Sequence, residues 1–217
     1  MSRIVFINCV FIIFFLGCQE PQQISLPYYN TPDFTPIFIE SKTEYQQKIS
    51  HRIAPFSMTD QHGLSITDQN IKDKIHIANF MFTRCTSICP RMTNNLKAIQ
   101  ETFKADDDLV MLSFSVTPWL DSVPELQRFS ERYEITSKNW HLLTGTTDEI
   151  YRLARQSYFA EEALGFTKDS TDFLHTERVL LVDKNKHIRG VYNATLPLEI
   201  EQLTQDIFSL KKEADFY

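Results

Sequence analysis

Two cysteines four residues apart are the side chains of this sequence best suited to chemistry. Cys85 and Cys89 stand in the stretch FTRCTSICP, residues 82–90. Alone, such a pair closes a disulfide or exchanges with the disulfide of another protein. With an imidazole as third donor, two thiolates select copper or zinc over magnesium or calcium. Cu(I) accepts three soft ligands, whereas zinc requires a fourth, which no further cysteine supplies.

The motif joins a predicted buried strand to a predicted amphipathic helix, and sites form at the carboxyl ends of strands in open α/β sheets. Pro90 at the first helical position would make Cys89 the helix cap and leave Cys85 in the preceding loop. If the turn is already helical, the four-residue spacing places both sulfurs on one face. In either arrangement the sulfurs converge at a helix N-terminus, which, together with Arg84, favours the thiolate form.

A histidine could supply the third donor, and the sequence holds six. Three at predicted strand ends or turns are expected to be solvated: His51, His62 and His187. Two that begin predicted strands are expected to be partly buried structural residues: His76 and His141. The sixth, His175, follows a polar stretch directly before a predicted strand. That loop could lie beside the cysteine helix, so His175 is the candidate ligand.

Apolar periodicity predicts alternating strands and helices from residue 51 onward. The predicted strands cover residues 51–59, 64–67, 75–82, 109–116, 140–143, 177–183 and 188–192. The predicted helices cover 91–103, a stretch opened by Pro124, 147–158 and 198–210. The turn at 60–63 makes the first two strands a hairpin. This order favours a three-layer α/β fold, with a thioredoxin-like sheet and an added N-terminal β-hairpin as the topology. Met81 and Met92 fall at core positions and are expected to pack there.

The amino terminus has the pattern of an export signal. Residues 1–17 contain one positive charge and an apolar run too short to span a bilayer, which predicts a signal peptide. A small residue followed by cysteine resembles a bacterial lipoprotein signal, so Cys18 is the expected lipidated residue. An uncleaved anchor and ordinary cleavage nearby are the alternatives. Residues 18–50 are rich in proline and predict a tether, and residues 51–217 form the domain.

Composition excludes several classes of protein. The chain has 217 residues, 42% of them hydrophobic, 23% charged, and a formal net charge of -6. This balance is that of a globular domain rather than a collagen-like, low-complexity or multi-span membrane protein. The acidic charge gives no electrostatic footprint for nucleic acid, so no nucleic-acid partner is expected.

Four segments in order resemble the SCO/SenC family: residues 82–90, SVTP at 115–118, LTG at 143–145, and His175-Thr176 before LLVD. The resemblance implies a thioredoxin-like, membrane-anchored protein that binds a copper ion through Cys85, Cys89 and His175. Two positions depart from the family, which commonly has aspartate where Thr117 and Leu174 stand. Asp121 or Asp172 could orient the loop or the imidazole instead.

The resemblance implies a metallochaperone that assists assembly of the copper site of a membrane respiratory oxidase. Its partner would be the copper-site subunit of cytochrome c oxidase or another cuproprotein. It would be exported and anchored to the membrane, facing the periplasm or the cell exterior. The alternative is a membrane-anchored thiol–disulfide oxidoreductase in which Cys85 and Cys89 are the catalytic residues acting on a thiol-redox partner. A structural disulfide between them is the third reading.

Overall fold

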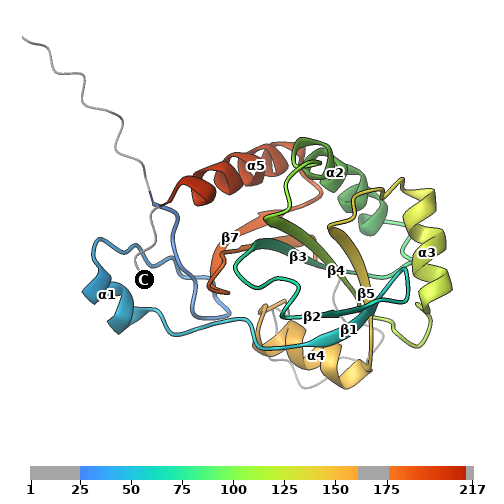
Figure 1. Ribbon diagram of the computed structural model, residues 1–217, viewed down its shortest axis with the longest axis horizontal. Coiled ribbons are helices and arrows are strands. Elements are labelled where there is room, and N and C mark those ends of the chain that lie inside the picture. The colour runs from blue at the N-terminus through green and yellow to red at the C-terminus, as the bar shows by residue number, and fades with distance from the viewer. Residues whose placement is uncertain (1–24, 161–175, 214–217) are drawn as a thin grey trace, which may run out of the picture.

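The structure is a computed structural model, and it describes residues 25–160 and 176–213 (Figure 1). The predicted signal peptide, Cys18, Asp172, Leu174 and His175 lie outside these residues. No helix in the described ranges has the length and apolar character needed to cross a membrane.

Seven strands form one sheet in the order β2-β1-β5-β4-β3-β6-β7. Their bounds are β1 Ser57–Asp60, β2 Ser65–Thr67, β3 Ile75–Met81, β4 Leu109–Ser115, β5 Trp140–Thr144, β6 Arg178–Val182 and β7 Ile188–Asn193. The three central strands β3, β4 and β5 are parallel, and β1, β6 and β7 join their neighbours antiparallel. The predicted N-terminal hairpin is present as β1 and β2. Its first strand begins only at Ser57, because Pro55 cannot donate a ladder hydrogen bond.

Helices cover both faces of the sheet (Figure 1). On one face lie α2 (Ile88–Thr102), α3 (Val123–Arg132) and α5 (Pro197–Lys212), and on the other lies α4 (Thr147–Gln156). The crossovers from β3 through α2 to β4, and from β4 through α3 to β5, therefore return on the same side. This arrangement confirms the predicted three-layer, thioredoxin-like architecture.

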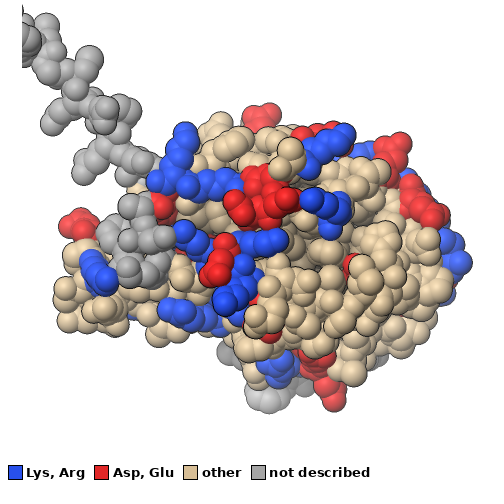
Figure 2. All heavy atoms as spheres, in the orientation of Figure 1, with Lys and Arg blue, Asp and Glu red and all other residues tan. Residues whose placement is uncertain are grey.

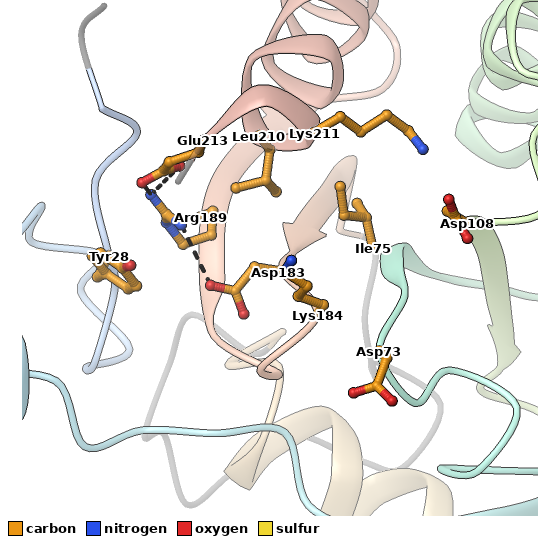
Figure 3. A pocket seen from close by; sticks show the side chains of 10 residues that line it. All are labelled: Tyr28, Asp73, Ile75, Asp108, Asp183, Lys184, Arg189, Leu210, Lys211 and Glu213. Carbon is orange, nitrogen blue, oxygen red and sulfur yellow. Dashed lines mark hydrogen bonds and ion pairs between the residues drawn. The ribbon is translucent and has the colours of Figure 1, made fainter. Parts of the chain in front are cut away.

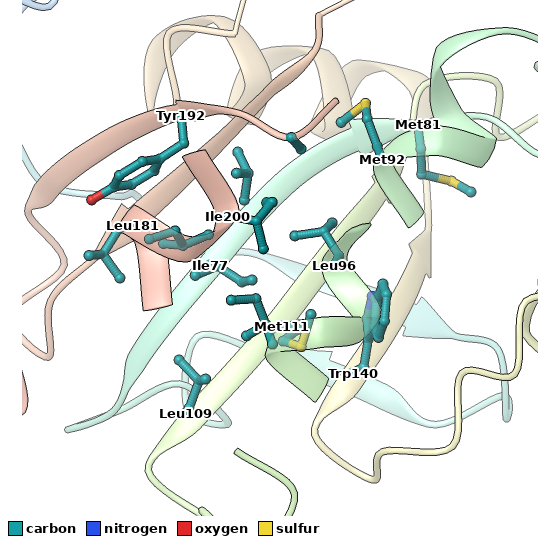
Figure 4. Packing of buried hydrophobic residues seen from close by; sticks show 14 of the residues in the cluster. Ile77, Met81, Met92, Leu96, Leu109, Met111, Trp140, Leu181, Tyr192 and Ile200 are labelled. Atoms are coloured by element: carbon teal, nitrogen blue, oxygen red, sulfur yellow. The ribbon is translucent and has the colours of Figure 1, made fainter. Parts of the chain in front are cut away.

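The central strands alternate their side chains between two apolar clusters, as the period of two in a strand requires. Ile77 and Met81 of β3 face the cluster beneath α2, α3 and α5, whereas Ala78 and Phe80 face the cluster beneath α4. Figure 4 shows the first cluster, where Met81 lies close to Met92 of α2. Both methionines are buried, with 2% of Met81 and 1% of Met92 exposed. The expectation that they pack in the core is confirmed.

Residues 25–50 are held against the sheet, where Tyr29 pairs with Ile188 of β7. It contains a helix that the sequence pattern did not predict, α1 (Lys42–Lys48), capped by the Ser41 side chain. The hydroxyl of Tyr45 in this helix lies 2.8 Å from Nε2 of His187. Nδ1 of His187 lies 2.6 Å from the His51 carbonyl oxygen. His187 is therefore buried, and the expectation that it is solvated is wrong: a distant segment of chain covers its turn.

Charged side chains of both signs are interspersed on the face of the molecule shown in Figure 2. Such mixing is expected of a protein whose net charge is modest. A local excess of one sign of charge therefore indicates a candidate binding surface.

Candidate metal centre

The cysteine motif lies where β3 ends and α2 begins. Helix α2 starts at Ile88 with Ser87 as its N-cap residue, so Cys89 is the second helical residue and Pro90 the third. The prediction that Cys89 caps the helix is wrong, and Cys85 does lie in the preceding loop. Pro90 fits inside the first turn because the first N–H groups of a helix have no partner within it.

The sulfur of Cys85 takes over part of the capping role. Ser87 makes no side-chain hydrogen bond to the helix end, whereas the N–H of Cys89 donates to Cys85 Sγ at 3.4 Å. Both cysteines are free thiols and buried, with 8% of Cys85 and 2% of Cys89 exposed. The two side chains thus meet at the first turn of α2, as both predicted arrangements required.

The surroundings separate the pKa values of the two thiols. Burial raises the pKa of Cys85, but the N–H groups of Cys89, Ser87 and Ile88 outweigh that effect and bring it below the ordinary cysteine value. Burial raises the pKa of Cys89 to about 12, and its interaction with Cys85 adds to the increase. Cys85 is therefore the thiol that ionises first, as expected at a helix N-terminus, whereas the expectation of a favoured thiolate is wrong for Cys89, which burial holds neutral.

A buried carboxylate fixes the loop that carries Cys85. Asp121 is fully buried and accepts hydrogen bonds from the N–H and the hydroxyl of Thr83, at 3.1 and 2.5 Å. It also accepts from the hydroxyls of Ser115, at 2.6 Å, and Thr117, at 3.1 Å. The carboxylate therefore joins the ends of β3 and β4 two residues before Cys85.

Asp121 thus has the orienting role toward the loop that the sequence analysis considered for it. Thr117, where the SCO/SenC resemblance leads one to expect aspartate, contributes a hydroxyl donor to Asp121. Thr83 and Ser115 were not predicted as partners of this carboxylate. The only available signal was the position of Thr83 just after β3 and of Ser115 at the last residue of β4, since Thr83 and Asp121 lie 38 residues apart in the sequence.

Five histidines lie in the described ranges, and the side chains of four of them have hydrogen-bond partners within the protein. His76 is fully buried beside the Tyr158 hydroxyl (Nε2 to oxygen, 3.0 Å), so it is more deeply buried than expected. His141 is half-buried with its Nδ1 3.0 Å from Asp60 Oδ2, and His62 is exposed as expected. His51 is half-buried rather than solvated, because its Nε2 lies 2.7 Å from a carbonyl oxygen of residue 157.

Within the described part of the chain, no three histidine, cysteine, aspartate or glutamate side chains come together in a group able to hold a metal ion. The structure thus brings together two of the three predicted ligands, Cys85 and Cys89. The third, His175, lies outside the described residues. Two sulfur donors suit a soft cation, whose binding would displace the proton of Cys89, and they leave at least one coordination position for another donor.

Two hollows mark the surface near the sheet ends. A groove of about 270 Å³ contains Cys85 in its lining and borders α3. A second hollow, of about 180 Å³, lies at the opposite ends of the strands, where Ile75 begins β3 (Figure 3). Arg189 fills part of it, ion-paired to Glu213 and Asp183. Only the first hollow gives access to the cysteine motif.

The sequence matches known proteins across the domain. The SCO1/SenC family profile matches residues 44–212. The SCO1 protein homolog of Bacillus subtilis (strain 168) is 27% identical over 168 residues, which cover 76% of this chain and 86% of the relative.

Solved structures share the fold. A SCO1/SenC family lipoprotein from Bacillus anthracis str. Ames superposes with a TM-score of 0.66 and 27% identity, covering 75% of this chain and 96% of that one. BsSco, described as a member of the Sco family of cytochrome c oxidase assembly proteins with a disulfide switch, gives a TM-score of 0.64 and 27% identity, covering 76% and 96%.

A copper-bound member has the same architecture. Yeast Sco1 with copper bound superposes with a TM-score of 0.60 and 22% identity, covering 76% of this chain and 91% of that one. At this identity the likeness is one of fold. Because the family profile extends over most of the chain and includes the cysteine motif, this protein belongs to the SCO1/SenC family.

Proposed function

We propose that this protein is a copper metallochaperone that holds one copper ion between Cys85, Cys89 and His175 and delivers it to the copper site of a membrane respiratory oxidase. The observation that carries the proposal is the meeting of two free, buried thiols at the first turn of α2. The relatives support it: BsSco belongs to a family of cytochrome c oxidase assembly proteins, and yeast Sco1 has a structure with copper bound.

The donor set suits Cu(I). Soft thiolates with one imidazole satisfy three-coordinate Cu(I), whereas zinc requires four ligands. Each step of delivery would replace one of these donors by a donor of the recipient, so the ion passes on without being released into water. The copper ion is therefore cargo, and reduced thiols are needed to hold it.

The position of Thr176, the residue that follows His175 in the sequence, supports the assignment of His175 as third ligand. Strand β6 runs antiparallel to β3, with Val179 opposite Asn79. The chain therefore enters β6 through Thr176 at the same end of the strands where β3 ends and the Cys85 loop begins. His175 is one peptide bond, about 3.8 Å between Cα atoms, from Thr176.

A Cu(I) titration against a competing chelator tests the proposal. We expect His175→Ala to weaken Cu(I) binding at least about tenfold, since one of three ligands is lost. His62→Ala is the matched control, because His62 is an exposed turn histidine, and it should bind Cu(I) like the wild type. Equal affinities for wild type and His175→Ala would contradict the three-ligand site.

A second function, thiol–disulfide exchange, is favoured by the separated pKa values of the pair. The Cys85 thiolate would attack one sulfur of a partner disulfide, forming a mixed disulfide and releasing the other partner thiol. Cys89 would then lose its proton and attack Cys85, forming the Cys85–Cys89 disulfide and releasing the second partner thiol. The partner gains two electrons and the pair loses two. His175→Ala should leave this exchange intact, and either single Cys→Ser change should abolish turnover.

The proposal includes export and attachment to a membrane through lipidated Cys18, facing the periplasm or the cell exterior. The cysteine after a short apolar leader supports it, as does the likeness to a SCO1/SenC family lipoprotein. Mass spectrometry of the amino terminus of protein from the membrane fraction tests it. We expect a diacylglyceryl group on Cys18, and release of the protein from membranes in Cys18→Ala if the leader is still cleaved. An unmodified residue 18 on a membrane-bound chain would contradict lipidation.

A further inference from the structure

The groove beside Cys85 carries a local positive charge. Arg84, Arg128 and Arg132 contribute to its lining, against a single carboxylate, Glu125. All three arginines are exposed. The sequence as a whole has a net charge of -6, so this excess of cations is opposite in sign to the rest of the molecule.

The charge is only partly neutralised from within the protein. Arg128 forms an ion pair with Glu125 one helical turn earlier in α3. Among residues 25–160 and 176–213, no carboxylate forms an ion pair with Arg84 or Arg132. Guanidinium groups in this arrangement can each take a carboxylate in a bidentate pair.

An exposed aromatic side chain lies at the same end of the strands, in the loop that follows β4. Trp119 is 53% exposed and lies in the turn between Thr117 and Asp121. Asp121 ties this turn to Thr83, which also lines the groove. Tryptophan and arginine are the side chains most enriched at energetic centres of protein interfaces. The groove and the turn therefore have the composition of a docking surface for a protein, which a site for a free inorganic anion would not need.

We propose that this surface docks an acidic segment of the partner protein and brings the partner's cysteine to Cys85. The inference rests on the proposed function in that metal delivery and thiol exchange both require a partner sulfur at this position. Carboxylates flanking that cysteine would pair with Arg84 and Arg132, and the local field would speed the encounter. The net negative charge of the chain would by itself repel such a segment, so attraction has to come from the groove.

The test uses two short cysteine peptides, one flanked by glutamates and one by glutamines, each joined through a disulfide to 2-thiopyridine. The Cys85 thiolate attacks the peptide sulfur, the Cys85–peptide disulfide forms, and 2-thiopyridone leaves as a chromophore. Reaction of both peptides with neutral 2-mercaptoethanol corrects for their intrinsic reactivity, and Cys85→Ser supplies the background. We expect the acidic peptide to react about tenfold faster at low ionic strength, with the ratio falling toward one in high salt.

Two charge-matched double variants identify the source of any preference. Arg84→Gln with Arg132→Gln removes the two groove charges that have no ion-pair partner in the described residues, whereas Lys72→Gln with Lys104→Gln removes two exposed charges at the opposite end of the strands. The preference should disappear in the first and persist in the second. Equal rates for both peptides, or equal losses in both doubles, would overturn the inference. The assay contains no copper, so its result is separate from that of the chelator titration.

Discussion

The sulfur of Cys85 accepts the N–H of Cys89 across 3.4 Å, so the first thiol of the pair occupies the position that a capping oxygen takes at other helices. The helix N-terminus stabilises negative charge on that sulfur, and burial opposes charge on its neighbour. One motif therefore presents a thiol that ionises more readily than an ordinary cysteine, beside a thiol that stays neutral.

Alkylation should reveal this difference in the copper-free, reduced protein. Because the pKa of Cys85 lies below the ordinary cysteine value, its reaction with iodoacetamide should persist at pH values where an ordinary cysteine is mostly protonated. Cys89, with a pKa of about 12, should remain unmodified over the same range. Peptide mapping by mass spectrometry across pH 5 to 10 measures both. Modification of Cys89 at a lower pH than Cys85 would contradict the assignment of Cys85 as the more readily ionised thiol.

Asp121→Asn should loosen the Cys85 loop. The amide keeps the shape of the carboxylate but cannot accept hydrogen bonds at both ends, so donors from Thr83, Ser115 or Thr117 lose their acceptor. We expect a loss of about 1–3 kcal/mol in the free energy of unfolding, measured by urea titration. The Cys85 alkylation profile should shift as well.

Asp108→Asn removes an exposed carboxylate and serves as the control for that change. It should leave both stability and Cys85 reactivity near the wild-type values. If Asp121→Asn lowered stability and left the alkylation profile unchanged, Asp121 would be a structural residue without influence on the cysteine loop.

Buried His76 should make the protein less stable in mild acid. Burial, with a smaller contribution from Lys186, lowers the pKa of His76 to about 3. Between pH 6.5 and 3 the unfolded chain binds a proton at this residue and the folded chain does not, so stability falls as pH falls. The contribution amounts to about 2 kcal/mol between pH 7 and pH 5.

Urea titrations of wild type and His76→Leu at these two pH values measure it. The leucine variant should lose about 2 kcal/mol less on acidification than the wild type. His62→Leu, at an exposed turn, should retain the wild-type pH dependence. Identical losses in His76→Leu and wild type would show that His76 is protonated in the folded protein.

Arg189→Gln should destabilise the protein strongly. The guanidinium is buried, ion-paired to Glu213 at 2.8 Å and Asp183 at 3.4 Å, and lies 3.9 Å from the centre of the Tyr28 ring. It also donates to the carbonyl oxygens of Leu26 and Pro27, which fastens the N-terminal segment. Removing one partner of such a buried cluster costs about 3–5 kcal/mol.

Thermal or urea unfolding, with limited proteolysis before residue 51, checks this expectation. Arg91→Gln, at an exposed site on α2, should have little effect on either. A change below about 0.5 kcal/mol in Arg189→Gln would mean that the cluster does not stabilise the fold.

The order of strands and helices and the location of the cysteine motif could be predicted from the sequence. Those features depend on short-range periodicity: the continuous apolar runs of β3 and β4, and the helical stripe of α2, are legible over a few residues. Helix α2 begins three residues earlier than predicted, at Ile88, because proline is tolerated throughout a first helical turn.

Other features depended on contacts between distant segments, which local patterns do not encode. His187 is buried only because the chain containing Tyr45, 142 residues earlier, folds over its turn. The partners of Asp121 converge from the ends of two strands, and Arg128 and Arg132 meet Cys85 only because α3 lies beside the loop that carries Cys85. Residue type and spacing determined which atoms could do chemistry, whereas packing of the sheet and its helices decided their neighbours, their burial and their charge.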